Sequence, residues 1–361
     1  MKIATIIGTR PEIIRLSLII RKLDQMAESH VLIHTGQNFV SSLKDVFFRE
    51  LVLRQPDYAF AGRELSFGRQ IAAQFEMLER ILSHERPDRV LVLGDTNSAL
   101  SAILAERMGI PVFHMEAGNR CFDRSVPEEL NRRIIDAVST INMPYTSRSK
   151  SNLLREGIPV NRIVQTGNPI YEVLRHYAVQ IAKSPVLDKL KLKPREYFLA
   201  TVHRSENVDR PDRLREILEG FNLVANEFGL RVICSLHPRT RSRLADIAAP
   251  LHPLVEFHEP FGFFDFVALE KNARCALTDS GTVQEECCIL RVPAVTVRTS
   301  TERPETVDCG SNVLAGVDRR SILEAVRLMS GMNADWDCPE GYEERNVSRK
   351  VAACLLGGGS V

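Results

Sequence analysis

Aromatic residues, basic tracts and paired cysteines are scarce in this chain of 361 residues, and each shortage excludes a class of function. Aromatic residues make up only 6% of the chain, too few for the stacking platforms on which proteins bind nucleic-acid bases. Lys and Arg together number 47 against 46 Asp and Glu, so the chain is nearly neutral and no basic tract stands out. We therefore expect no nucleic acid among the partners of this protein.

Long apolar runs and cysteine motifs are also missing. The apolar run in the opening MKIATIIGTRPE is far too short to span a membrane, and no signal-type cleavage site accompanies it. The eight cysteines include no C-x-x-C pair, so we interpret them as small buried side chains in a reducing compartment, not as a disulfide framework or a zinc site. These features predict a cytoplasmic protein with no membrane partner.

Two nucleotide-binding signatures are absent as well. The chain has neither a P-loop lysine motif nor a G-x-G-x-x-G after its first strand, which argues against an NTPase or a dehydrogenase. No group of residues has the spacing of a metal site. Acidic residues in one cleft could hold Mg²⁺, but arginines and a helix N-terminus can neutralise a diphosphate without metal. We therefore expect neither a metal nor a cofactor.

The chain is rich in short apolar runs that alternate with helix-length amphipathic segments, a pattern typical of α/β proteins with parallel sheets covered on both faces. The strand-like runs are 2–8, 30–36, 89–95, 111–115, 140–145 and 162–167, then 197–203, 230–237, 254–258, 273–279 and 293–298. A polar segment at 184–197 separates the two series. We predict two Rossmann-like, doubly wound domains facing a cleft, over 1–170 and 171–340, with a helix in 341–361 packing back on the first.

Polar residues follow many of these runs, at the ends where open parallel sheets bind ligands. In the first half they are Gly8-Thr9-Arg10, Gly94-Asp95-Thr96 and Glu116. In the second half they are His203-Arg204, His237 and Asp279-Ser280-Gly281. Because solvated loops would not place polar residues so regularly, we expect both domains to direct these residues at one cleft.

The stretch TDSGTVQEE, residues 278–286, predicts a phosphate site at a helix N-terminus. The first N–H groups of a helix lack internal partners and its dipole favours anions, while Gly281 allows close approach of the backbone. The carboxylates that follow suit the hydroxyls of a sugar such as ribose. An ordinary Ser/Thr helix cap is the alternative interpretation of the same residues.

Acids and arginines of the first half form the second candidate group. Asp95 could act chemically or only cap the next helix, and Glu128 and Arg132, four residues apart, could simply form an ion pair. Glu116 has no obvious capping role, which favours function. In the second half, His203 could be a general acid or base, a phosphate ligand or a structural histidine.

The motifs of both halves together resemble those of the UDP-N-acetylglucosamine 2-epimerase family, which has the two-domain fold of the GT-B glycosyltransferases. The matching segments are GTRPEIIR (8–15), HTGQN (34–38), GDTNS (94–98), HMEAGNR (114–120), PEELNRR (127–133), TGNP (166–169), TVHRSEN (201–207), TDSGTVQEE (278–286) and TERPE (301–305). The resemblance implies a homodimeric isomerase that acts on a UDP-sugar. It gives catalytic roles to Asp95, Glu116, Glu128 and His203. Binding of the UDP-sugar would fall to Arg10, Arg15, Arg132, Asn168, Arg204, His237, Ser280, Gly281, Thr282, Glu286 and Arg303.

Three departures from the family pattern concern Arg15 in place of lysine, Asn38 in place of histidine, and Thr282 in place of glycine. The fuller strings are most similar to a subgroup that forms UDP-N-acetyl-L-fucosamine for capsule or O-antigen. The implied reaction is non-hydrolysing C2 epimerisation through elimination of UDP. A hydrolysing epimerase, a GT-B glycosyltransferase and a non-enzymatic nucleotide-sugar sensor are the alternatives.

Overall fold

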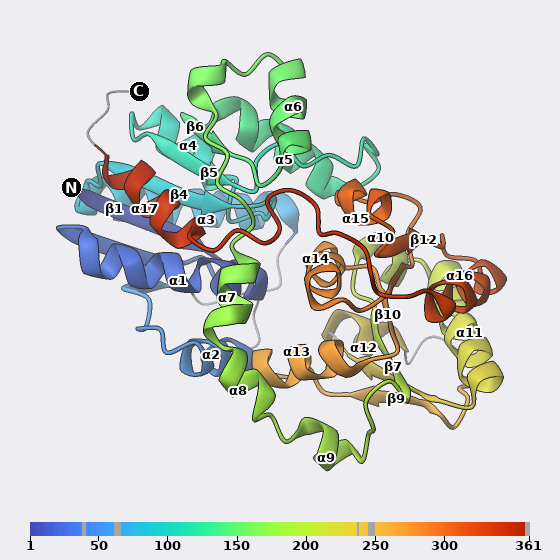
Figure 1. Ribbon diagram of the computed structural model, residues 1–361. Helices are drawn as coiled ribbons and strands as arrows, with labels where there is room; N and C mark the ends of the chain where they lie inside the picture. Colours follow the sequence, from blue (N-terminus) through green and yellow to red (C-terminus); the bar gives the residue numbers. More distant parts are fainter. Residues whose placement is uncertain (38–40, 61–65, 237, 245–249, 358–361) are drawn as a thin grey trace. The chain divides into compact units, whose positions relative to one another are not determined.

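The computed structural model describes residues 1–37, 41–60, 66–236, 238–244 and 250–357. The chain divides into two compact units, unit 1 with Met1–His176 and Glu340–Val361, and unit 2 with Tyr177–Pro339 (Figure 1). In the described part of the chain each unit contains one parallel six-stranded sheet with helices around it.

Unit 1 is built from alternating strands and helices. Its elements are β1 (Lys2–Ile7), α1 (Arg10–Met26), β2 (Ser29–His34), α2 (Ser41–Glu50), β3 (Tyr58–Ala59), α3 (Phe67–Glu85), β4 (Arg89–Leu93), α4 (Ser101–Arg107), β5 (Val112–Met115), α5 (Pro127–Val138), β6 (Ile141–Met143), α6 (Ser147–Arg155), the 3₁₀ turn η1 (Val160–Arg162), α7 (Ile170–His176) and α17 (Val347–Leu356). The strand order is β3-β2-β1-β4-β5-β6. Helix α17, from the end of the chain, packs against α1 (Figure 1).

Unit 2 repeats this plan. Its elements are α8 (Ala178–Ala182), α9 (Val186–Leu190), β7 (Tyr197–Thr201), α10 (Ser205–Val208), α11 (Pro211–Phe228), β8 (Arg231–Ser235), α12 (Pro238–Leu244), β9 (Val255–His258), α13 (Phe263–Asn272), β10 (Cys275–Thr278), α14 (Gly281–Leu290), β11 (Ala294–Thr296), α15 (Pro304–Asp308), β12 (Asn312–Leu314) and α16 (Arg319–Gly331). The strand order is β12-β11-β10-β7-β8-β9. Counted from each unit's first strand, the two sheets therefore have the same topology.

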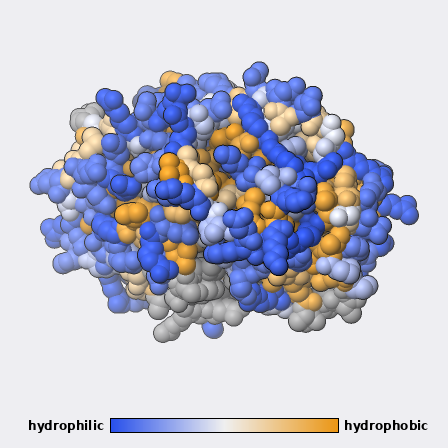
Figure 2. Space-filling view, turned by 60° about the horizontal axis from the view of Figure 1, so that its bottom comes forward, coloured by the Kyte–Doolittle hydropathy of each residue, from blue (hydrophilic) through white to orange (hydrophobic). Residues whose placement is uncertain are grey.

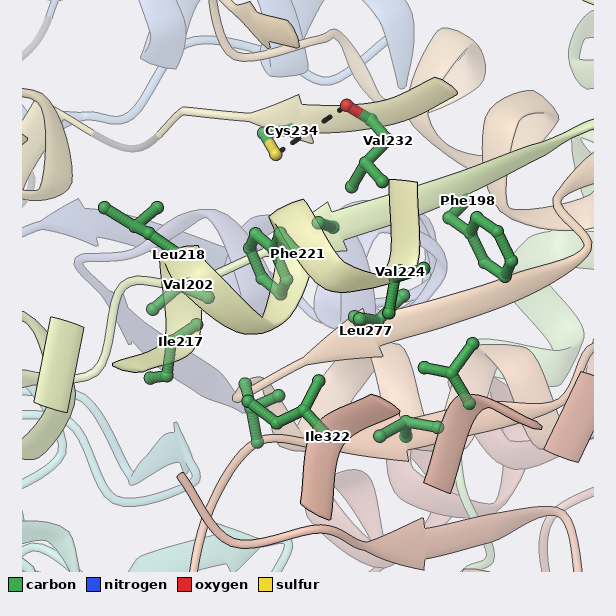
Figure 3. Packing of buried hydrophobic residues seen from close by; sticks show 14 of the residues in the cluster. Phe198, Val202, Ile217, Leu218, Phe221, Val224, Val232, Cys234, Leu277 and Ile322 are labelled. Carbon is green, nitrogen blue, oxygen red and sulfur yellow. Dashed lines mark hydrogen bonds between the residues drawn. The ribbon is translucent and has the colours of Figure 1, made fainter. Parts of the chain in front are cut away.

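Helix α11 shows how the sequence forms these layers. Pro211 occupies the first turn, and Gly229 ends the helix in the left-handed conformation that glycine adopts without strain. Its apolar stripe includes Ile217, Phe221 and Val224 and lies in the core of unit 2, where side chains of α11, β7, β8, β10 and α16 meet (Figure 3). Each fully buried side chain of this kind contributes about 1.5–3 kcal/mol.

Three elements differ from the sequence prediction. Residues 162–167 do not form a strand: the turn η1 precedes a single parallel bridge between Ile163 and Asn142. The short edge strands β3 and β12 were not expected. They have only two and three residues, too few for an apolar periodicity to reveal them.

The visible surface is mostly hydrophilic. On the face shown in Figure 2, hydrophilic residues predominate and apolar residues form separate groups among them. Within the described ranges, no helix combines the length and apolar character needed to cross a membrane.

Candidate active-site residues in the two units

The carboxyl ends of β1, β4 and β5 form one edge of the sheet of unit 1, because these three strands are neighbours and run parallel. Glu116 follows β5 and Asp95 follows β4. A β-carbon built on Gly94 would lie 3.9 Å from Oε1 of Glu116, so the Glu116 carboxylate lies beside the turn that carries Asp95. The predicted acids Asp95 and Glu116 are thus close to each other.

Glu116 is held by a buried ion pair. Its backbone has a φ of 66°, a left-handed conformation that is strained for a residue with a side chain. Its carboxylate pairs with the guanidinium of Arg15 from α1, and the two residues are only 7% and 2% exposed. The same guanidinium lies over the ring of Tyr145, 5.9 Å from its centroid. Arg15 therefore points into the fold beside the site and is not a solvent-facing residue of α1.

Asp95 is engaged by Arg132 and is not the N-cap of the next helix, because α4 begins only at Ser101. Nε and Nη2 of Arg132 lie 2.9 and 2.7 Å from Oδ2 of Asp95. Nη1 of Arg132 lies 2.9 Å from Oε2 of Glu129, which is fully buried. Glu129, absent from the sequence prediction, therefore orients Arg132 toward the end of β4. Glu128 lies in the first turn of α5, directly after Pro127, and is half-buried.

Arg10 and Glu12 begin α1 at the end of β1. The guanidinium of Arg10 lies 5.9 Å from the ring centroid of Phe47, and no carboxylate pairs with it among the residues the structure describes. Burial lowers the pKa of Arg10, the expected effect of holding a cation away from water. A half-buried guanidinium with this environment is suited to an anionic ligand.

Glu12 is a site-forming residue that the sequence prediction missed. Its carboxylate accepts hydrogen bonds from the backbone N–H groups of Gly8 and Thr9 at 2.9 and 2.7 Å and from Oγ1 of Thr96 at 2.9 Å. It therefore ties the turn after β1 to the turn after β4. Burial raises the pKa of Glu12 to about 7, against the opposing effect of these hydrogen bonds. The spacing of Thr9 and Glu12, which matches a capping box, was the signal available in the sequence.

In unit 2 the turn after β7 is organised by Asp279, the residue that follows β10. Its buried carboxylate accepts hydrogen bonds from the backbone N–H groups of His203 and Arg204 at 3.0 and 2.9 Å, and from Nδ2 of Asn207 at 3.1 Å. Nδ1 of His203 lies 3.4 Å from the same carboxylate. The pKa of Asp279 is raised, because the effect of burial exceeds the opposing effect of the hydrogen-bond donors around the carboxylate. His203, one-third exposed, is thereby oriented at the end of the sheet.

The predicted phosphate turn does form the N-terminus of a helix. Ser280 is the N-cap of α14, and its hydroxyl lies 2.9 Å from Oγ1 of Thr282. A β-carbon on Gly281 would lie 2.5 Å from Oε1 of Glu302 and 3.5 Å from Cζ of Arg303, so only glycine leaves room for these groups.

Glu302 and Arg303 form the charged surroundings of this turn. Glu302 pairs with Arg204 at 2.9 Å and with Arg298 at 2.8 Å, and Arg303 pairs with the buried Glu285. Glu302 and Glu285 were not among the predicted residues, since neither strand ends nor helical spacing mark them. Carboxylates of the protein itself thus hold the arginines near this turn in place.

Glu286 lies in α14 and is only 6% exposed. Burial and the neighbouring Glu286 both raise the pKa of the fully buried Glu270 of α13 well above its usual range. A raised pKa favours the protonated form of Glu270, which reduces the repulsion between the two carboxyl groups.

The structure gives Asn168, a predicted binding residue, a local structural role. Asn168 caps the start of α7, where its Oδ1 accepts from the N–H of Ile170 at 3.1 Å, and its own N–H donates to the carbonyl of Gly341 at 2.8 Å. His237 lies outside the described residues, as does Asn38. In the ranges that the structure covers, no three His, Cys, Asp or Glu side chains converge as metal ligands would.

Two doubly wound sheets of identical strand order, each with polar side chains at its carboxyl edge, define an α/β protein of the GT-B class. A structure of Acinetobacter baumannii MurG shares this fold at 12% sequence identity, with a TM-score of 0.53 and coverage of 98% of this chain and 99% of that one.

Sequence comparison defines the family within that class. The family model described as UDP-N-acetylglucosamine 2-epimerase matches residues 21–356, and the chain belongs to this family. The UDP-N-acetylglucosamine 2-epimerase of Methanocaldococcus jannaschii is 40% identical over 356 residues, covering 94% of this chain and 95% of the relative. The UDP-2,3-diacetamido-2,3-dideoxy-D-glucuronate 2-epimerase of Pseudomonas aeruginosa is 37% identical over 360 residues, covering 98% and 99%.

A solved structure supports the same assignment over the whole length. The crystal structure of the M. jannaschii enzyme in complex with UDP-GlcNAc and UDP matches with a TM-score of 0.94 at 39% identity. The match covers 99% of this chain and 100% of that one. The resemblance found in the sequence motifs is therefore confirmed at the level of the family.

Proposed function

We propose that this protein catalyses the non-hydrolysing epimerisation of a UDP-2-acetamido sugar at C2. The observation that carries the proposal is the edge of the sheet in unit 1, where Asp95 and Glu116 lie close together and each is held by a buried arginine. Family membership supports it, since the relatives described above are named as 2-epimerases of UDP-acetamido sugars.

The chemistry requires the bond to UDP to break before the proton moves. No carbonyl activates the C2 proton, so the C1–O bond breaks first and a positive charge develops on the sugar ring. Glu116 and Glu128 stabilise this charge as carboxylates. One carboxylate then removes the C2 proton to give a 2-acetamidoglycal. Protonation at C2 from the opposite face and return of UDP to C1 complete the reaction with no net change in atoms.

The departing UDP needs groups that stabilise a diphosphate and hold a ribose. Arg10, His203 and the N-terminus of α14 at Ser280 and Gly281 serve the diphosphate, together with Arg132 and Arg204. Glu286 accepts hydrogen bonds from the ribose hydroxyls. The further residues assigned to the UDP-sugar are Arg15, Asn168, His237, Thr282 and Arg303.

The biological setting that we propose follows the resemblance. The protein acts as a cytoplasmic homodimer that supplies precursors for a bacterial surface polysaccharide such as capsule or O-antigen. Its substrate is a UDP-N-acetylhexosamine, and the motif strings GTRPEIIRLS, GDTNSALSAI and HMEAGNRCFD favour the 6-deoxy sugar of the UDP-N-acetyl-L-fucosamine route.

A substrate panel followed by NMR tests this function. The purified protein is incubated in D₂O with UDP-N-acetylglucosamine, UDP-N-acetylmannosamine and their 6-deoxy analogues. We expect a C2 epimer that carries deuterium at C2, with no steady release of free UDP. Stoichiometric release of UDP and free sugar would instead show a hydrolysing enzyme. A product that keeps its original hydrogen at C2 would exclude the elimination route.

A further inference from the structure

Three of the eight cysteines meet at the C-terminal end of α14 in unit 2. Cys288 lies in the last turn of α14, Cys309 directly follows α15, and Cys338 lies in the segment after α16. The sulfur atoms of Cys288 and Cys309 are 3.8 Å apart, and Sγ of Cys338 lies 3.6 Å from the carbonyl oxygen of Cys288. Scattered positions in the sequence thus become one thiol cluster, a grouping that the sequence did not indicate.

The first two thiols differ in their surroundings. Cys288 is fully buried, whereas Cys309 is half-buried and so can be reached from solvent. Sγ of Cys309 lies 3.3 Å from Oγ of Ser311. The contact with the Cys288 thiol lowers the pKa of Cys309 to about 6, and the same contact raises the pKa of Cys288. A solvent-accessible thiol of lowered pKa therefore lies next to a buried thiol of raised pKa, an arrangement found in redox-sensitive cysteines.

We propose that Cys309 and Cys288 form an oxidation site that reacts with hydrogen peroxide to give a reversible disulfide. The Cys309 thiolate attacks one peroxide oxygen, the O–O bond breaks, and hydroxide leaves, which gives a sulfenic acid. The Cys288 thiol then attacks the sulfenic sulfur, the S–O bond breaks, and water leaves with the thiol proton. Two thiols lose two electrons, and one peroxide is reduced to two waters.

Formation of this disulfide would change the positions of helices α14 and α15. A disulfide has an S–S length of about 2.05 Å, so the two sulfurs must approach by well over 1 Å from their present separation of 3.8 Å. Helix α14 begins at Gly281 in the phosphate turn, and α15 follows directly after Arg303 (Figure 1). Joining the distal ends of these two helices pulls them together and displaces the groups at their starts. Weaker UDP binding after oxidation is therefore expected, a consequence that rests on the proposed function.

Peptide mapping of the oxidised protein tests the site itself. The purified protein is treated with hydrogen peroxide, its remaining thiols are alkylated under denaturing conditions, and the digest is analysed by mass spectrometry without reduction. We expect a linked peptide pair joining Cys288 to Cys309, which dithiothreitol separates. Wild-type protein suffices for this test. If both cysteines remain alkylatable, or if Cys288 is linked to Cys338 instead, the proposal is wrong.

Variants and a binding measurement complete the design. Cys309→Ser should abolish the link, and Cys288→Ser should leave a sulfenic acid on Cys309 that dimedone traps. The control is Cys354→Ser, which should leave the link intact, because Cys354 is a half-buried cysteine of α17 in unit 1. Calorimetry should show a UDP dissociation constant at least about tenfold higher after oxidation, restored by dithiothreitol. An unchanged constant with the disulfide present would overturn the coupling to UDP. Failure of reduced protein to bind UDP would contradict the proposed function and leave the oxidation site standing.

Discussion

Replacing Glu116 by glutamine should separate the chemical role of this carboxylate from its structural one. Glutamine has nearly the same shape and keeps an oxygen that can accept a hydrogen bond from Arg15, but it carries no charge and cannot accept a proton as a base. Glu116 is 7% exposed and Arg15 only 2%. Little water can therefore reach the Arg15 guanidinium to compensate its positive charge once the charge of Glu116 is removed. The substitution thus removes proton transfer and leaves the local packing in place.

The expected magnitudes follow from this environment. Removing one partner of a buried ion pair costs about 3–5 kcal/mol, and the retained amide oxygen should reduce this to about 1–3 kcal/mol. We expect a fall in melting temperature of about 2–10 °C. Turnover should fall by about 10²-fold or more, the usual loss when an acid–base group is removed. UDP affinity should change little, because the proposed UDP contacts lie mainly in unit 2.

The assay compares turnover by NMR, thermal unfolding and UDP calorimetry for wild type and variant. Glu156→Gln is the matched control, because Glu156 pairs with the buried Arg120 in the same unit while Arg120 keeps its second partner Asp136. The control should retain turnover within about threefold, well short of the loss expected for an acid–base group. If Glu116→Gln folds and also keeps turnover within a few-fold of wild type, Glu116 is structural and the assignment fails.

Four further predictions test other parts of the site. Arg15→Lys should weaken substrate binding and leave the shape of the pH–rate profile unchanged, because Arg15 cannot exchange protons near neutral pH. A new basic limb in that profile, with turnover retained, would instead make position 15 an acid–base site. EDTA should not abolish turnover, since arginines and a helix N-terminus neutralise the diphosphate, whereas loss reversed by Mg²⁺ or Mn²⁺ would show a metal requirement. Gly281→Ala should raise the UDP dissociation constant, measured by calorimetry, about tenfold, because the new methyl would lie 2.5 Å from Oε1 of Glu302. An unchanged dissociation constant would place the phosphates elsewhere. Burial and Glu286 raise the pKa of Glu270, so folding takes up a proton there and stability should decline as pH rises from the ordinary range of glutamate through the raised pKa. Denaturant titrations should show a smaller decline for Glu270→Gln, and equal slopes would contradict the raised pKa of Glu270.

The sequence by itself determined the class of this protein. Uninterrupted apolar runs such as β4 and β10 require burial on both faces, which means parallel strands covered by helices, and the chain contains two series of them. Polar residues directly after these runs, such as Asp95 and Glu116, marked the sheet edges where ligands bind. The motif order indicated the family, and the comparisons confirm it.

Only the tertiary structure decided which of these residues act on one another. Arg15 meets Glu116 across 101 positions because β1 lies beside β4 and β4 beside β5, an order that no local periodicity encodes. The same reason explains why Glu302 and the pairing of Glu270 with Glu286 were missed, since Glu302 meets Arg204 98 positions away and Glu270 and Glu286 lie on different helices. Glu129 pairs with Arg132 within one helix, and its part in the site depends on the contact of Arg132 with Asp95. The thiol cluster also depends on packing, because Cys288 and Cys309 are 21 positions apart and approach only when α14 and α15 lie together.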